Sequence, residues 1–148
     1  VRKEPVDKIV VEKRQLSLKP GELILGFTIP VCRRCGSAFM KFNYRATNIL
    51  ALVSVSILLK LSDDNKIESA KVVFDRVKRR IPDNVPEVEQ YLAGKYASTE
   101  TLEDAVSVLM KNMIRKGDFR ASGEYREHLS KVLFKRAFWK AYQRARVV

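Results

Sequence analysis

The feature that most constrains the fold is a long apolar stripe in the C-terminal part of the chain, between Asp118 and Phe138. Ser122 is placed to be a helix N-cap, because its hydroxyl can accept hydrogen bonds from the free N–H groups of a first turn. Glu124 follows in that turn, where a negative charge suits the helix dipole. Apolar residues then recur at helical spacing, at Tyr125, Leu129, Val132, Leu133 and Ala137. A long amphipathic helix at the end of a small chain needs a surface to cover, which the preceding residues should supply.

Those preceding residues carry the alternation of β-strands. Residues 22–30 alternate and end at a proline, which predicts a half-buried strand with one apolar face made of Leu23, Leu25, Phe27 and Ile29. Residues 37–45 predict a second strand, and residues 50–61 and 67–74 a third and a fourth. The last two should form an antiparallel hairpin, because Ser62–Asn65 has the composition of a turn.

Helical patterns follow the strands at residues 87–93, which should end at Gly94, and at residues 99–113, capped by Ser98 or Thr99. Strands joined by short turns and followed by helices predict an α+β fold. We expect an antiparallel sheet of three to four strands with two to three C-terminal helices packed on one face. Residues 1–19 should be a connector arm, and residues 20–148 the α+β domain.

The charge of the chain is strongly positive, with 29 basic against 17 acidic residues and a formal net charge of +12. Such a balance favours polyanionic partners. The basic residues are scattered, however, and do not alternate with aromatic residues, so a solvated surface is the expected role and nucleic acid is not the expected partner. No apolar run approaches the roughly 20 residues of a membrane helix. Two cysteines without a secretion signal indicate a cytoplasmic protein.

The candidate reactive residues do not form a recognisable catalytic or metal site. Cys32 and Cys35 have the spacing of half a zinc site, but the single histidine, His128, lies on a distant helix. Loop thiols without a function are the expected interpretation, and an intersubunit metal site made by two copies is the alternative. His128 has no nucleophile in a recognisable setting, and the six glycines form no phosphate-binding pattern. No catalytic or metal-binding residues are therefore predicted.

One strand carries a more suggestive pattern. Lys41, Asn43 and Arg45 alternate along residues 37–45, so two cations and an amide should project from one face. From the spacing alone, these residues are expected to be a polar outer face of the sheet. The residues by themselves thus predict a basic α+β domain without a self-contained active site.

Several short motifs, in order along the chain, resemble one family. Residues 118–126 (Asp-Phe-Arg-Ala-Ser-Gly-Glu-Tyr-Arg), with Val132-Leu133 and Arg136-Ala137 after them, resemble the last helix of the FAD-binding medium subunit of molybdenum hydroxylases. That family includes xanthine dehydrogenases, carbon monoxide dehydrogenases and aldehyde or nicotinate oxidoreductases. Further motifs in the family's order are Gly21-Glu22-Leu23-Ile24 with Ile29-Pro30, Phe39-x-Lys41-Phe42 with Arg45-Ala46, Leu52-Val53-Ser54-Val55, Ile67-x-x-Ala70 and Glu89-x-x-Leu92-x-Gly94-Lys95. The resemblance extends over about residues 16–137.

The resemblance implies a C-terminal domain without the family's glycine-rich FAD-binding half, which in the family precedes this region. In the family this domain closes over the flavin from one side. The lysine that matches Lys41 lies close to FAD, and the residue that matches Ile24 adds an apolar contact. An ammonium group beside a flavin can stabilise negative charge on the reduced ring. The implied partners are the FAD-binding domain, an iron–sulfur small subunit and a molybdopterin large subunit, so the chain would be part of a multi-subunit oxidoreductase.

Two features depart from the family's pattern. Residues 74–80 hold bulky and charged side chains where the family commonly has small residues and a proline near the flavin, and the loop of Cys32 and Cys35 has no counterpart. The alternative function is a stand-alone basic module that binds a protein or nucleic acid without flavin.

The last helix carries a second run of apolar residues, made of Phe134, Phe138, Ala141, Tyr142 and Ala145. One sheet face should not bury two stripes. We therefore expect the second stripe to meet a partner, which could be the FAD-binding domain, a neighbouring subunit or a further copy of this chain.

Overall fold

The structure, a computed structural model, describes residues 1–12, 15–45, 50–75, 82–113 and 117–147. The chain forms two compact units, Val1–Val31 and Cys32–Val148. We call them the N-terminal unit and the sheet unit, and describe each by itself.

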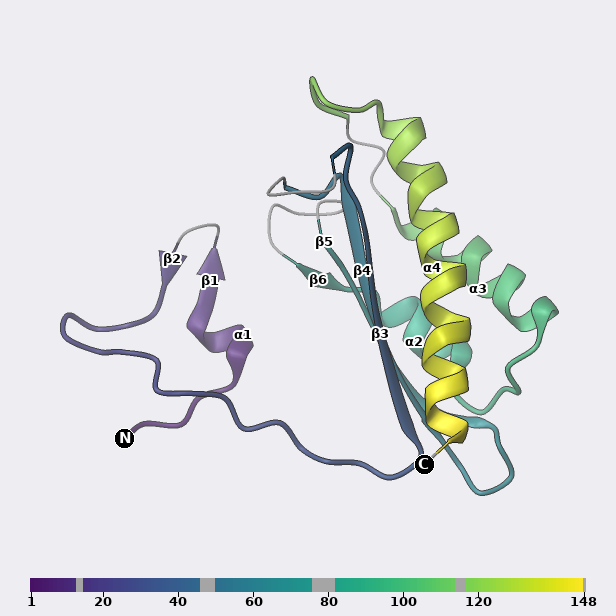
Figure 1. Cartoon of the computed structure of the whole chain (residues 1–148), viewed down its shortest axis with the longest axis horizontal. Helices are drawn as coiled ribbons and strands as arrows, with labels where there is room; N and C mark the ends of the chain where they lie inside the picture. Colours follow the sequence, from purple (N-terminus) through teal and green to yellow (C-terminus); the bar gives the residue numbers. More distant parts are fainter. Residues whose placement is uncertain (13–14, 46–49, 76–81, 114–116, 148) are drawn as a thin grey trace. The chain divides into compact units, whose positions relative to one another are not determined.

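The sheet unit is built on a four-stranded antiparallel sheet in the order β3-β4-β5-β6 (Figure 1). The strands are β3 (Cys35–Phe42), β4 (Val53–Leu61), β5 (Ile67–Asp75) and the short β6 (Asp83–Asn84). Alternate residues of β4 and β5 are buried, as the period-two pattern predicts. The turn between these strands places Asn65 at a positive φ of 62°, a conformation that asparagine tolerates. The predicted hairpin is therefore confirmed.

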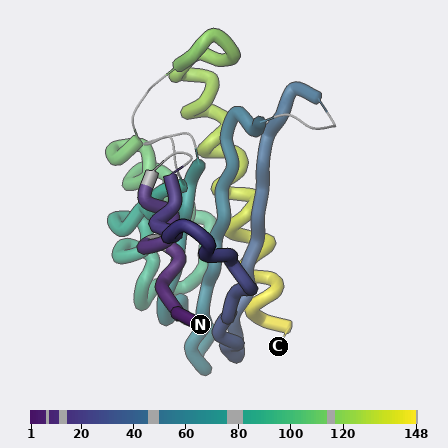
Figure 2. The backbone as a smooth tube through the Cα atoms, turned by 90° about the vertical axis from the view of Figure 1, so that its left-hand side faces the viewer, coloured from purple at the N-terminus to yellow at the C-terminus, as the bar shows by residue number. Residues whose placement is uncertain are grey.

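Three helices of the sheet unit cover one face of this sheet, which confirms the α+β prediction (Figure 1). They are α2 (Pro86–Leu92), α3 (Thr99–Asn112) and α4 (Gly123–Arg146). Ser98 and Ser122 are the N-caps of α3 and α4, and their hydroxyls accept hydrogen bonds from the backbone N–H groups of Thr101 and Tyr125. Figure 2 shows α4 running along the length of the β3–β4 hairpin.

The prediction that α4 carries two stripes, one of them for a partner, is wrong. The apolar side chains that α4 buries follow one another at intervals of one, three or four residues and form a single stripe: Leu129, Leu133, Phe134, Ala137, Phe138, Ala141 and Ala145. Phe134 and Phe138 are 0% exposed. A single stripe can hold all these buried side chains because α4 packs along β3 and β4 rather than across them.

The C-terminal half of α4 approaches β3 closely at Gly36. A Cβ atom at Gly36 would lie 2.0 Å from the backbone oxygen of Ala141 and 2.4 Å from the backbone nitrogen of Ala145. Only a glycine allows this approach, since no side chain fits between the two backbones. The contact explains how the small residues of the stripe are buried within the chain.

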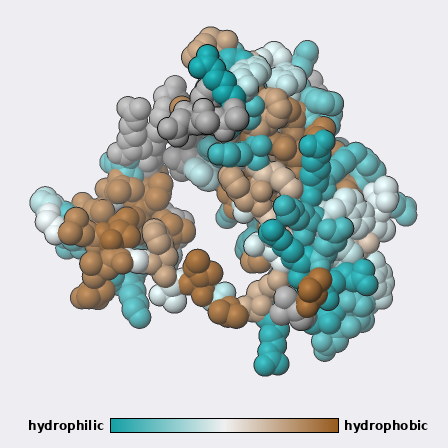
Figure 3. All heavy atoms as spheres, viewed as in Figure 1, coloured by the Kyte–Doolittle hydropathy of each residue, from teal (hydrophilic) through white to brown (hydrophobic). Residues whose placement is uncertain are grey.

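The N-terminal unit contains α1 (Val6–Ile9) and the short antiparallel strands β1 (Val10–Glu12) and β2 (Gln15–Leu16). The half-buried strand predicted for residues 22–30 is not present. These residues have no regular secondary structure, and Leu23, Leu25, Phe27 and Ile29 are between 74% and 83% exposed. Figure 3 shows apolar side chains gathered on this unit. The alternation thus describes residues that remain largely exposed in the described chain.

Among the described residues, no helix combines the length and the apolar composition that crossing a membrane requires.

Candidate functional site

The face of the sheet opposite the helices is the candidate site, and we call it the open face. It consists of the alternate residues of β3, β4 and β5 that point away from the helices: Cys35, Ser37, Phe39, Lys41, Ser54, Ser56, Leu58, Lys60, Ser69, Lys71, Val73 and Asp75. Among the described elements, none of the helices α2 to α4 covers this face (Figure 1).

The strand register brings these residues into rows. Lys41 pairs with Ser54, and Ser54 pairs with Asp75 on the next strand. In the neighbouring row, Phe39 pairs with Ser56 and Ser56 with Val73. Residues that pair across antiparallel strands have Cβ atoms about 5 Å apart, so each row is a set of neighbours. The two serines place small side chains in the middle of both rows.

Lys41 and Phe39 are the prominent side chains of these rows. Both are exposed, and Phe39 is 61% exposed, which is unusual for an aromatic residue on a sheet surface. The prediction that Lys41 lies on the face opposite Met40 and Phe42 is confirmed, because those two residues pack against the core. Sequence reasoning gave Phe39 no role, although its spacing of two residues from Lys41 places it on the same face. A cation and an apolar ring beside small residues suit a flat, partly charged ligand.

The other residues expected at the candidate site are not part of β3. β3 ends at Phe42, so Asn43 and Arg45 follow the strand instead of sharing its outer face. Ile24 is 48% exposed and belongs to the N-terminal unit, whereas Lys41 belongs to the sheet unit. The loop of residues 76–80, expected to differ from the family's pattern, lies outside the described residues.

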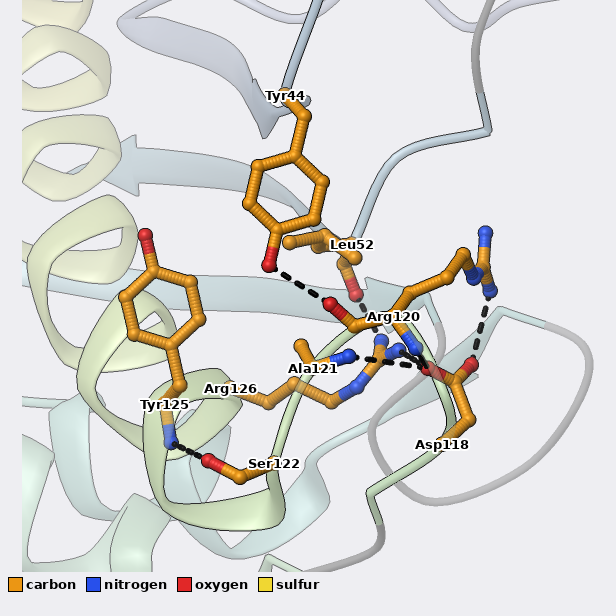
Figure 4. A network of polar contacts seen from close by, with 8 residues as sticks. All are labelled: Tyr44, Leu52, Asp118, Arg120, Ala121, Ser122, Tyr125 and Arg126. Carbon is orange, nitrogen blue, oxygen red and sulfur yellow. Dashed lines mark hydrogen bonds and ion pairs between the residues drawn. The ribbon is translucent and has the colours of Figure 1, made fainter.

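A network of polar contacts centred on Asp118 lies at the end of the β3–β4 hairpin, next to Tyr44 and Leu52 (Figure 4). One oxygen of the Asp118 carboxylate accepts hydrogen bonds from the backbone N–H of Arg120 at 2.9 Å and from Nη2 of Arg126 at 2.7 Å. The other oxygen accepts one from Nη2 of Arg120 at 3.0 Å. A single carboxylate thereby fixes the turn that leads into α4.

This network reaches both strands of the β3–β4 hairpin. The Arg126 guanidinium, which is buried, donates to the backbone oxygen of Leu52, the residue before β4 (Figure 4). The Tyr44 hydroxyl, just after β3, donates to the backbone oxygen of Arg120 at 2.7 Å. Lys41 and Ser54 lie within three residues of these two anchor points along the chain. The start of α4 therefore positions the end of the hairpin that carries Lys41.

The pKa of the Asp118 carboxyl reflects these contacts. Desolvation is the largest single influence and raises the pKa, but the hydrogen bonds from the Arg120 backbone and from the Arg120 and Arg126 side chains outweigh it. The pKa of Asp118 is therefore held well below its ordinary value. Asp118 is thus ionised at neutral pH and serves as an anchor for two arginines rather than as a proton donor.

The remaining candidates lie apart from the open-face rows of Phe39 and Lys41. Cys32 and Cys35 form a disulfide, so the expectation of free loop thiols is wrong. His128 is exposed on α4. Within the described ranges, no cluster of three or more histidine, cysteine or acidic side chains could hold a metal ion.

The fold matches that of known proteins. Residues 37–141 match the family of the CO dehydrogenase flavoprotein C-terminal domain. The chain belongs to this family. The match includes β3, β4, β5 and most of α4, so it contains the open-face rows and the Asp118 network.

Individual relatives agree with this assignment. The chain is 31% identical over 118 residues to the glyceraldehyde dehydrogenase medium chain of Sulfolobus acidocaldarius, covering 80% of this chain and 41% of that protein. A chain of the reconstituted CO dehydrogenase from Oligotropha carboxidovorans superimposes with a TM-score of 0.73 at 26% identity, covering 88% of this chain and 45% of that one. Quinoline 2-oxidoreductase from Pseudomonas putida 86 shares the fold, with a TM-score of 0.77 at 21% identity over 93% of this chain and 47% of that one.

The chain thus spans less than half the length of these relatives. Membership of the flavoprotein family does not favour the alternative of a stand-alone basic binding module.

Proposed function

We propose that this chain is the C-terminal domain of the FAD-binding subunit of a molybdenum-hydroxylase-type oxidoreductase. In this role the open-face rows of Phe39 and Lys41 form one wall of the flavin site. The observation that carries the proposal is the pair of exposed side chains, Lys41 and Phe39, on the sheet face that the helices leave uncovered.

The residues of the open face fit a flavin chemically. A flavin presents a flat ring system and polar edge atoms, and it gains negative charge when it is reduced. Ser54 and Ser56 are small enough to let a flat ring approach, and Phe39 offers an apolar surface beside them. The Lys41 ammonium would supply a positive charge at the edge of that surface. When bound, FAD would accept and pass on electrons, while the residues of this chain bind and orient it.

Ile24 is proposed as a second contact. Its neighbours Leu23, Leu25 and Phe27 are more than 70% exposed, so the segment has apolar side chains available for another protein surface. We propose that this surface is the FAD-binding domain, and that Ile24 lies at the flavin when the two domains join.

The proposed assembly also contains an iron–sulfur small subunit and a molybdopterin large subunit. Electrons would pass from the molybdenum centre through the iron–sulfur clusters to FAD, and the assembly would be cytoplasmic. No catalytic residues are assigned to this chain. Its proposed role is to form one wall of the flavin site and to bind the partner subunits.

The proposal is tested by replacing Lys41 with methionine in an assembly that contains the FAD-binding domain. The replacement keeps the length of the side chain and removes its charge, so we expect flavin to bind roughly tenfold more weakly, as for the loss of a charged contact. The flavin midpoint potential should become more negative, because the reduced form loses a neighbouring cation. Flavin content after desalting and a redox titration measure both effects.

Lys60→Met is the matched control, because Lys60 lies on the same face but its Nζ is paired with Glu68 Oε1 at 2.6 Å. Lys60→Met should leave the flavin affinity and the flavin midpoint potential unchanged. Unchanged retention and potential in Lys41→Met would remove Lys41 from the flavin site.

A further inference from the structure

The Cys32–Cys35 disulfide is a chemically reactive group that the proposed flavin role does not use. It closes a segment in which the two cysteines are three positions apart, with their Cα atoms 5.7 Å apart, a normal separation for a disulfide. Cys35 is the first residue of β3 and pairs with Lys60 of β4. Cys32 is the first residue of the sheet unit and lies outside the ladder. The bond therefore ties the start of the unit to the edge strand of the sheet.

Contacts other than the disulfide hold the turn between the two cysteines. Arg34 has a positive φ of 53°, and its backbone oxygen accepts a hydrogen bond from the N–H of Leu61 at 2.9 Å. Its guanidinium donates to Oδ1 of Asn65 at 2.6 Å, in the turn between β4 and β5. These contacts do not involve sulfur, so they would keep the two thiols close together after reduction. A preformed turn of this kind raises the effective concentration of one thiol at the other.

The two sulfurs differ in their access to solvent. Cys32 is exposed, whereas Cys35 is half-buried at the start of the strand. Arg33 and Arg34 lie between them, and Lys60 is opposite Cys35, although Lys60 is also paired with Glu68. Positive neighbours and the spacing of two intervening residues favour the thiolate form of a cysteine, which is the reactive form.

We propose that Cys32 and Cys35 are a reversible thiol–disulfide exchange site whose reaction partner is an external dithiol. A thiolate of the dithiol attacks Sγ of Cys32, the Cys32–Cys35 bond breaks, and Cys35 leaves as a thiolate that takes up a proton. The second thiol of the partner then attacks the mixed disulfide and releases Cys32. The partner loses two electrons and becomes a disulfide, and the cysteine pair gains them and becomes two thiols. Reduction thus releases Cys32 from β3 without loss of the sheet.

The first test measures the equilibrium between the two states in the full chain. The chain is equilibrated in mixtures of reduced and oxidised dithiothreitol, quenched in acid, alkylated, and weighed by mass spectrometry to count its free thiols. We expect a transition between zero and two free thiols within one chain. The equilibrium constant for disulfide formation should be at least about tenfold larger in the folded chain than in guanidinium chloride, because the turn is preformed.

Asn65→Ala tests the role of the turn, since it removes the partner of the Arg34 guanidinium and leaves both cysteines. The ratio between the folded and unfolded equilibrium constants should fall in this variant. Asp63→Ala, in the same turn, is the control and should leave the ratio unchanged. The proposal would be overturned if the equilibrium constant for disulfide formation were equal in the folded and the unfolded wild-type chain. It would also be overturned if disulfides formed between chains in place of the internal one.

Single replacements test which sulfur is attacked. Cys35→Ser leaves the exposed Cys32, and Cys32→Ser leaves the half-buried Cys35, so a disulfide reagent should react roughly tenfold faster with the first variant. Equal or reversed rates would contradict attack at Cys32. These measurements need no flavin or partner subunit, so a failure of the proposed flavin role would leave them unaffected.

Discussion

Asp118 shows at the level of a residue how one side chain can connect distant parts of a chain. Its carboxylate holds Arg120 and Arg126, and Arg126 in turn reaches the backbone of Leu52 at the start of β4. The Arg126 side chain is 6% exposed, so its charge depends on this carboxylate for compensation. The conspicuous motif of residues 118–126 is therefore a structural anchor for the hairpin end that carries Lys41.

We expect Asp118→Asn to lower the free energy of unfolding by about 1 kcal/mol at neutral pH, a small value because the carboxylate is partly exposed. The pKa of Asp118 is lowered in the folded chain, so its contribution is complete above its ordinary value of 3.8 and is lost as the pH falls through the lower folded pKa. Urea unfolding at several pH values measures this. The difference between wild type and variant should shrink below about pH 4.

Asp63→Asn is the control, because Asp63 is an exposed carboxylate of the turn between β4 and β5. It should have little effect at any pH. A difference between wild type and Asp118→Asn that stays constant down to acid pH would contradict the assigned charge interaction.

At the level of elements, the structure depends on how α4 lies against the β3–β4 hairpin. The helix spans 24 residues and buries one continuous stripe along the strands. Phe134 contacts Phe74 of β5 with ring centroids 6.3 Å apart, so the stripe also reaches the next strand. Helix and sheet approach each other closely at Gly36, where two backbones come together without an intervening side chain.

Gly36→Ala should therefore destabilise the chain by about 2 kcal/mol or more, because the new methyl group meets the backbone of α4 and the helix must shift. The control is Gly26→Ala, since a Cβ atom at Gly26 has nothing within 4 Å. Chemical denaturation followed by circular dichroism measures both variants. A Gly36→Ala chain as stable as the control would show that α4 can move away from β3 at no cost.

For the whole molecule, the core lies entirely within the sheet unit. The buried apolar cluster of the described chain runs from Ala38 to Ala145, and it includes no residue of the N-terminal unit. The N-terminal unit instead exposes apolar residues that would need another surface to cover them. The sheet unit therefore has a hydrophobic core of its own, whereas the N-terminal unit contributes no residue to that core.

We expect a chain of residues 32–148 to unfold cooperatively, with a free energy of unfolding within about 0.5 kcal/mol of the full chain, because it retains the whole core. Urea denaturation of both chains measures this. A truncated chain that is aggregated, or that loses its cooperative transition, would show that the N-terminal unit stabilises the sheet.

The fold could be predicted from the sequence where a short segment determines its own structure. The caps at Ser98 and Ser122, the hairpin turn before Ile67 and the alternation of β4 depend on neighbouring residues, and all are as predicted. The prediction for residues 22–30 failed because alternation shows only that one face is apolar, and not that the chain itself buries that face.

The candidate site was predicted in part. Lys41 was assigned to the outer face from its spacing, and its exposure agrees. Phe39 was missed because an aromatic residue in a strand is usually a core residue, although its spacing of two residues from Lys41 places it on the open face, where it pairs with Ser56. The link between Asp118 and Leu52 joins residues far apart in the chain, and local patterns contain no information about such a contact.

The sequence by itself determined the helices and the hairpin of the sheet unit, the order of strands before helices in that unit and the resemblance to the flavoprotein family, since each rests on local spacing or on ordered motifs. Only the tertiary structure decided that α4 buries one stripe instead of two, that the Asp118 motif anchors the hairpin, and that Cys32 and Cys35 are joined. Each of these depends on which surfaces meet in space. The depth of the contact at Gly36 and the position of Leu52 beside Arg126 are set by packing, and packing is a property of the folded chain.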